Sequence, residues 1–106
     1  MTATDTTIAE LDEAQVRVDL AAAFRLAARM DLHESVANHF SATVSADGKR
    51  FLCNPRWRHF GLVTASELLL LDADDPSTMD RPDAPDPSTW CIHGAIHARI
   101  PTARAV

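Results

Sequence analysis

The stretch that decides the fold of this chain is residues 52–68, with the sequence LCNPRWRHFGLVTASEL. It begins as an apolar strand, and this strand must end at Pro55, because proline cannot donate to a sheet ladder. A loop with aromatic and basic residues follows. Thr64 and Glu67 then have the spacing of a capping box, in which threonine caps a helical turn. The stretch therefore predicts a strand, an abrupt stop and one short helical turn.

Toward the N-terminus, the sequence predicts a long helix that ends near Met30. Thr7 and Glu10 form a second capping box at its start, and residues 1–8 are expected to be a disordered tail. Apolar residues recur at helical spacing and indicate a helix that is covered on most sides. These residues are Val16, Leu20, Phe24 and Ala27, with Leu26 and Met30 widening the stripe.

A hairpin lies between this helix and the deciding stretch. From Asn38 the apolar period changes to two, so Phe40, Ala42 and Val44 should face one side, and His39, Ser41 and Thr43 the other. Asp47-Gly48 supplies the positive backbone angles of a tight reversal. Residues 50–53 are then the returning strand.

The C-terminal third predicts a buried strand at residues 68–71, a proline- and aspartate-rich loop at 72–87, and a final helix. Ser88 is expected to cap this helix, which should run to about Arg99, with Pro101 closing it. The elements together indicate a mixed α/β unit.

Bulk composition excludes several function classes. The chain has 106 residues, 46% apolar content and a net charge of -5, so it is at most one domain, and nonspecific nucleic-acid binding is disfavoured. No apolar run is long enough to span a bilayer, and no signal pattern opens the chain. Cys53 and Cys91 lack CxxC spacing and are expected to be reduced and buried, as in a cytoplasmic protein.

Three motifs in this order resemble the class II aldolase/adducin family. Residues 54–68 match the family run NP-x-x-x-x-F-x-x-[IV]-TAS-[DE]-L, while residues 38–41 precede it as NHFS and residues 90–97 follow it as WCIHGAIH. The resemblance covers roughly residues 15–106. It implies a three-layer α/β/α sandwich with a mixed, partly antiparallel sheet, incomplete at the C-terminus, of which residues 9–106 are the N-terminal portion.

Two pairs of polar residues are the candidate substrate-binding residues. Asn38 and His39 open the first strand, where an amide and an imidazole could hold a ligand or merely cap a turn. The resemblance implies a pocket here and a glycine-asparagine pair for phosphate, so this pair puts phosphate in doubt. Ser88 and Thr89 begin the last helix, whose free N–H groups attract anions, although such residues are usually caps.

The resemblance implies no catalytic residue in this chain. Thr89 stands where the family has its acid/base glutamate, and a threonine hydroxyl cannot transfer protons near neutral pH. The family zinc is held by three histidines, two of them on a strand that would start near Val106. None of the five histidines of the chain matches these positions. A divalent metal, zinc by expectation, would therefore belong only to a full-length protein.

Other polar residues have a structural and a functional interpretation. His93 and His97, four apart on a helix, have the geometry of a metal half-site, but the pair is more typical of packing. Asn54 could lock the strand end. The loop cations Arg56 and Arg58 could meet an anion or another subunit, or the loop is solvated with Trp57 against the core.

Two functions remain open for the complete protein. The first is a metal-dependent lyase for aldol cleavage, epimerisation or decarboxylation of a small hydroxy-carbonyl or sugar-phosphate-like substrate. The alternative is a non-catalytic adducin-like assembly module. The resemblance also implies a cytoplasmic homo-tetramer. The chain alone is expected to be inactive and aggregation-prone or molten, because residues 68–71 and the final helix would expose apolar surface.

Overall fold

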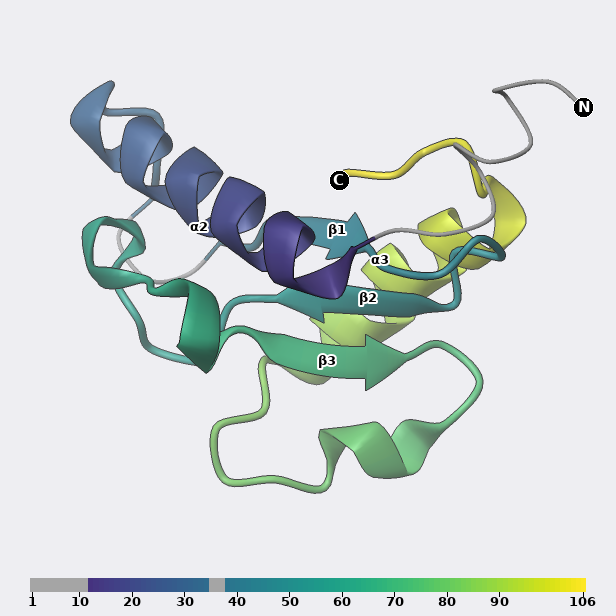
Figure 1. Cartoon of the computed structure of the whole chain (residues 1–106). Helices are drawn as coiled ribbons and strands as arrows, with labels where there is room; N and C mark the ends of the chain where they lie inside the picture. The colour runs from purple at the N-terminus through teal and green to yellow at the C-terminus, as the bar shows by residue number, and fades with distance from the viewer. Residues whose placement is uncertain (1–11, 35–37) are drawn as a thin grey trace, which may run out of the picture.

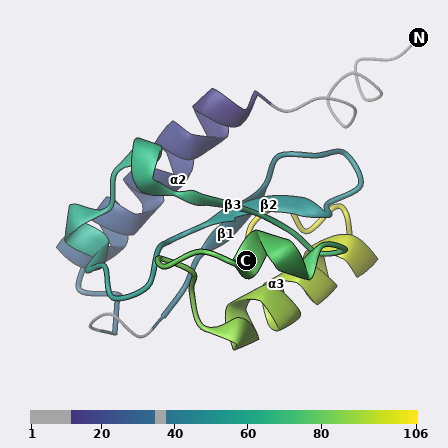
Figure 2. The ribbon, with the colours of Figure 1, turned by 90° about the horizontal axis from the view of Figure 1, so that it is seen from below.

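Two helices enclose a three-stranded sheet in this chain, as its computed structural model shows for residues 12–34 and 38–106. Helix α2 (Glu13–Arg29) lies on one face of the sheet and α3 (Pro87–Arg99) on the other (Figures 1 and 2). The strands are β1 (Ser41–Thr43), β2 (Arg50–Cys53) and β3 (Leu69–Asp72), joined in part by the 3₁₀ turns η1 (Phe60–Leu62), η2 (Ala65–Glu67) and η3 (Pro76–Met79). The layers are those of the expected α/β/α sandwich.

Helix α2 begins later and is less covered than the sequence predicts. Asp12 has extended backbone angles and caps the helix by accepting from the Ala14 and Gln15 amides at 3.0 and 3.4 Å. The expected capping box at residues 7–10, like the expected tail at 1–8, lies outside the described residues. Leu26 and Met30 are 54% and 65% exposed, so the prediction of a broadly covered stripe was wrong. Leu26 and Met30 lie on a different face of the helix from Phe24, and only the face that carries Phe24 packs against the sheet.

The sheet order is β1-β2-β3, and both pairings are antiparallel. The reversal between β1 and β2 uses Gly48, whose φ of 77° is easy for glycine, as expected for an Asp-Gly turn. Residues 104–106 return beside β1, where the Thr43 amide donates to the Arg104 carbonyl at 2.9 Å and the Ser41 amide to the Val106 carbonyl at 2.8 Å. Residues 104–106 thus pair with β1 through an isolated antiparallel bridge between Ala42 and Ala105.

Alternation along β2 divides the core into two clusters. Leu52 faces α2 and packs with Leu20, Phe24 and Phe60. Phe51 and Cys53 face α3 and pack with Leu69, Leu71 and Trp90. The expectation that residues 68–71 would expose apolar surface was therefore wrong, because α3 covers the sheet on that side.

Some apolar side chains of the final helix are exposed, as expected. Ile92 and Ile100 are both more than half exposed. The aggregation-prone or molten behaviour of the isolated chain stays a prediction, although the two clusters remove part of its basis. Neither of the two α-helices in the described ranges has the length and hydropathy needed to cross a bilayer.

The two predicted helix caps both differ from expectation. The Thr64 hydroxyl donates to the Glu67 carboxylate at 3.1 Å instead of capping the backbone of η2. Helix α3 is capped by Asp86, which accepts from the Ser88 amide at 2.9 Å, so the prediction of Ser88 as the cap was wrong. Pro87 explains the shift, because proline favours the first helical position and leaves the cap to the residue before it.

The two cysteines differ in environment. Cys53 is buried, and its burial raises the pKa of the thiol to about 12, which makes it unreactive. Cys91 is exposed on the outer side of α3, so the prediction that both would be buried was wrong.

Candidate functional site

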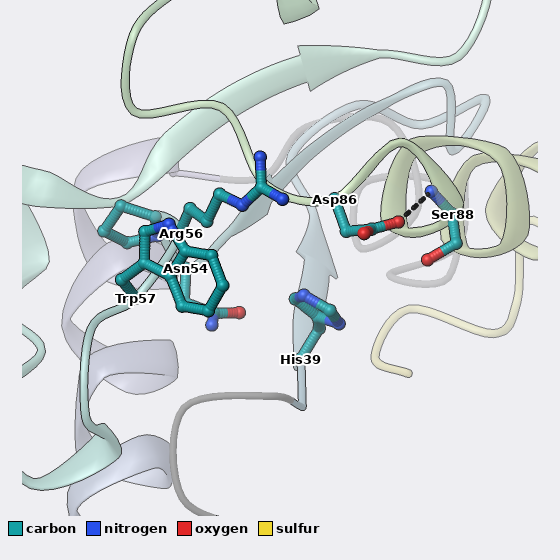
Figure 3. A pocket seen from close by; sticks show the side chains of 7 residues that line it. His39, Asn54, Arg56, Trp57, Asp86 and Ser88 are labelled. Carbon is teal, nitrogen blue, oxygen red and sulfur yellow. Dashed lines mark hydrogen bonds between the residues drawn. The ribbon is translucent and has the colours of Figure 1, made fainter.

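The candidate site is a cavity of about 240 Å³ between the start of β1, the loop after β2 and the N-terminus of α3. Figure 3 shows side chains from all three segments directed toward it. Three segments that are far apart along the chain therefore meet at one place: two belong to the motifs at residues 38–41 and 54–68, and the third directly precedes the motif at residues 90–97. The lining residues are His39, Asn54, Pro55, Arg56, Trp57, Asp86 and Ser88.

Asn54 joins two of these segments and leaves a polar atom unused. Its side-chain amide donates to the Asn38 carbonyl at 3.2 Å, which locks the end of β2 against the residue that precedes β1, as the sequence suggests. Asn54 is only 2% exposed, and its side-chain oxygen has no partner in the described structure. Buried polar atoms normally find a partner. The oxygen is therefore a buried acceptor without a donor among the described residues, on a residue that lines the cavity.

Trp57 belongs to the loop after β2, which forms one wall of the cavity. It has a φ of 67°, although bulky residues rarely adopt positive φ, and its side chain is 70% exposed. The interpretation of Trp57 against the core was therefore wrong. The Arg56 guanidinium stacks 4.9 Å from the indole centroid. Arg58 instead pairs with Glu67 through two contacts of 2.7 and 3.1 Å, which ties the loop to η2.

The N-terminus of α3 already carries a carboxylate. Asp86 accepts from the backbone amide and the hydroxyl of Ser88, and these bonds hold the pKa of Asp86 below its ordinary value. Asp86 is thus ionised at neutral pH, at the helix end that would otherwise attract an anionic ligand. It cannot serve as a general acid there.

Behind the cavity, Ser41 links two imidazoles. Its hydroxyl oxygen lies 2.6 Å from His93 Nδ1 and 2.7 Å from His97 Nε2, while His97 Nδ1 lies 2.8 Å from the Ala103 carbonyl. A carbonyl only accepts, so His97 donates from Nδ1 and accepts the Ser41 proton at Nε2. Ser41 then accepts from His93 Nδ1. The four groups form a directed chain of hydrogen bonds.

These histidines are neutral at physiological pH. Burial, together with the nearby His39 and His97, lowers the pKa of His93 to about 4. Burial also lowers the pKa of His97, against the effect of its bond to Ala103. For His39, burial lowers the pKa more than Asp86 raises it. The buried, bonded pair His93 and His97 agrees with the packing interpretation.

The residues present do not fit a metal ion. In residues 12–34 and 38–106, no three histidine, cysteine, aspartate or glutamate side chains come together as ligands would. Zinc ordinarily takes at least three protein ligands. The family zinc therefore has no place among the described residues, and no reaction step is assigned to it.

The four predicted substrate-binding residues have different positions. His39 and Ser88 line the cavity. Asn38 lies behind Asn54 and also has an unpartnered side-chain oxygen. Thr89 is 1% exposed, and its hydroxyl has no partner in the described structure, so it lies under the first turn of α3 and outside the lining.

Sequence reasoning missed Asp86 as a site residue. The signal was present, because an aspartate directly before a proline at the start of a helix is a strong cap candidate. No comparable signal exists for the positive φ of Trp57.

Comparison with known proteins agrees with this arrangement. The family model for the class II aldolase and adducin N-terminal domain matches residues 18–106. A Pseudomonas aeruginosa protein, named as a class 2 aldolase, is 40% identical over 85 residues, which are 80% of this chain and 32% of that protein. The chain spans about a third of the length of the curated relatives it matches.

Two solved structures share the fold. An aldolase II superfamily protein from Pseudomonas syringae superposes with a TM-score of 0.74 at 37% identity, over 88% of this chain and 38% of that one. The L-fuculose 1-phosphate aldolase from Glaciozyma antarctica superposes with a TM-score of 0.72 at 25% identity, over 88% and 39%.

Proposed function

We infer that this chain, which belongs to the class II aldolase and adducin family, supplies a substrate-binding wall of a metal-dependent lyase. The lyase would be a longer protein that cleaves, epimerises or decarboxylates a small hydroxy-carbonyl compound. The observation that carries the proposal is the convergence of three segments, far apart in the sequence, on one polar cavity. Such a cavity with a few convergent polar groups is the default binding site of an enzyme fold.

The residues of this chain would bind and orient the substrate. The neutral His39 imidazole can donate and accept a hydrogen bond, the Ser88 hydroxyl, which donates to Asp86, can still accept one, and Arg56 can only donate. Thr89 cannot transfer a proton near neutral pH, and the ionised Asp86 cannot act as a general acid. The general acid of the proposed lyase would therefore come from groups outside this chain.

The metal of the proposed lyase, zinc by expectation, would likewise be bound by residues outside this chain. When bound, such an ion supplies a Lewis acid that polarises a carbonyl group. We extend the proposal to a cytoplasmic homo-tetramer whose ligand is a small molecule, not a nucleic acid or a membrane.

A non-catalytic assembly module is the second candidate. It is favoured by Thr89, which stands where the resemblance implies a glutamate and whose buried hydroxyl has no partner in the described structure. A fold kept only for assembly can lose its acid/base without consequence.

Metal analysis and lyase assays on the gene product that contains this chain separate the two candidates. Stoichiometric zinc with turnover of a hydroxy-carbonyl compound supports the lyase, whereas a folded protein with neither supports the assembly module. For the lyase, Ser88→Ala should raise KM. The matched control Ser66→Ala alters an exposed serine of η2 and should leave KM unchanged.

A further inference from the structure

We propose that the cavity at the N-terminus of α3 selects an uncharged, polyhydroxylated group, the sugar part of a substrate, in preference to phosphate. Trp57 is then the specificity-determining residue. The inference rests on the proposed function, because it concerns the occupant of the same cavity. Three independent features of the lining carry it: the aromatic wall, the surplus of hydrogen-bond acceptors and the balance of charge.

The aromatic wall is the indole of Trp57. This side chain is 70% exposed beside the cavity, on a backbone with a φ of 67°. Strained positions of this kind concentrate at ligand sites, because the surrounding structure must hold them. An indole face carries negative charge and therefore attracts the weakly positive C–H groups on the face of a sugar. A phosphate group has no C–H groups and gains nothing from this contact.

The acceptors are Asn54 and Asp86. The Asn54 side-chain oxygen is buried and unpartnered within the described structure, and Figure 3 shows its amide between Trp57 and His39. The Asp86 carboxylate faces the cavity from the other side and only accepts hydrogen bonds when ionised. The Asn54 oxygen lacks a donor in the described part of the chain, and the Asp86 carboxylate can accept further hydrogen bonds beside those from Ser88. Sugar hydroxyls supply such donors, whereas a phosphate dianion offers only acceptor oxygens.

The charge balance also disfavours phosphate. A helix N-terminus ordinarily attracts an anion, but here the Asp86 carboxylate already takes the Ser88 amide at 2.9 Å. Arg56 is the one cation in the lining and is offset by Asp86, while His39 is kept neutral by burial. The net charge of the residues that line the cavity is therefore close to zero. A phosphate entering it would meet a fixed negative charge at the helix end.

Titration of the chain with D-fructose, D-fructose 1-phosphate and inorganic phosphate tests the inference. Nuclear magnetic resonance can follow the backbone amide signals of Arg56 and Ser88, which line the cavity and are present in every variant. We expect fructose to bind at least tenfold more tightly than inorganic phosphate. Trp57→Gly should reduce fructose affinity at least tenfold without unfolding, because glycine accepts the positive φ.

A second variant tests the charge argument. Asp86→Ser keeps a residue that can cap α3 but removes the carboxylate, so it should weaken fructose binding and strengthen phosphate binding. Asp75→Ser makes the same change at the cap of η3, away from the cavity, and should alter neither.

Three results would overturn the inference. Tighter binding of inorganic phosphate than of fructose refutes the specificity but leaves the cavity as a substrate site of the proposed lyase. Unchanged fructose affinity in Trp57→Gly refutes the role of the indole. Absence of binding by all three ligands refutes the selectivity, and only the metal and turnover assays on the gene product then decide the proposed function.

Discussion

Ser41→Ala is the most informative single change in the fold, because one buried hydroxyl joins two imidazoles. Ser41 is fully buried and lies 2.6 Å from His93 Nδ1 and 2.7 Å from His97 Nε2. The substitution removes only the oxygen atom. It leaves a buried N–H group of His93 without an acceptor and a buried nitrogen of His97 without a donor.

The expected loss in the free energy of unfolding follows from these two groups, which would be left without hydrogen-bond partners. A buried polar group that loses its partner costs about 1–3 kcal/mol, so the two together should cost about 2–6 kcal/mol. Small domains have a free energy of unfolding of only about 5–15 kcal/mol. The substitution should therefore remove a large part of the stability of the chain, mostly by loosening α3 from β1.

Urea unfolding, followed by circular dichroism at low protein concentration, measures this loss as a lower midpoint. Ser66→Ala is the matched control, because Ser66 is exposed in η2 and its truncation should change the free energy of unfolding by less than about 0.5 kcal/mol. A loss below about 1 kcal/mol in Ser41→Ala, with an unchanged slope, would refute the directed hydrogen-bond chain.

Three further changes test the packing and the histidines. His93 has a pKa of about 4 in the fold against an ordinary 6.5, so only the unfolded chain takes up its proton between these values. The free energy of unfolding should therefore be highest above pH 6.5 and fall by about 3 kcal/mol toward pH 4. Urea midpoints measured across pH should show a flatter slope for His93→Asn. Gly48→Ala should be strongly destabilising, because the new methyl group would lie 2.2 Å from the His97 carbonyl oxygen on a backbone with a φ of 77°. In the control Gly61→Ala, the nearest atom belongs to a side chain at 3.2 Å, and similar melting temperatures for the two variants would contradict this reasoning. Phe24→Ala should lower the free energy of unfolding in urea by about 3–5 kcal/mol, because Phe24 is fully buried, with the Phe60 and Phe40 ring centroids at 4.5 and 5.1 Å. A loss no larger than that of Leu26→Ala, at an exposed position, would argue against the core cluster under α2.

Local signals in the sequence were enough to predict three strands, although β3 begins one residue later than expected and β1 is limited to Ser41–Thr43. Strand β2 occupies residues 50–53 as expected, because an Asp-Gly turn fixes one end and Pro55 the other. The alternation from Phe40 to Val44 correctly separated the face toward α2 from the face toward α3. The family was also correct, since three motifs in order are far more specific than one.

The errors have a common cause, which is that burial and capping depend on tertiary context. Leu26 and Met30 fit a helical stripe, yet only one side of α2 meets the sheet. Ser88 is a good cap by residue type, but Pro87 transferred that role to Asp86.

The site could be predicted only in outline. Of the four residues predicted to bind substrate, His39 and Ser88 line the cavity, and their binding role stays a prediction. The exposure and positive φ of Trp57 have no sequence signal, because the loop also makes contacts with remote segments, such as the hydrogen bond from the Arg56 amide to the Asp83 carbonyl. The burial of Thr89 likewise follows from how α3 packs on the sheet.

Zinc titration of this chain, measured by calorimetry with the histidine nitrogens followed by nuclear magnetic resonance, tests the central claim most directly. That claim is that the chain binds substrate while its metal ligands lie elsewhere. We predict no stoichiometric zinc binding and unchanged signals from His39, His93 and His97. One zinc ion bound with submicromolar affinity, with these three imidazoles shifting together, would contradict the account.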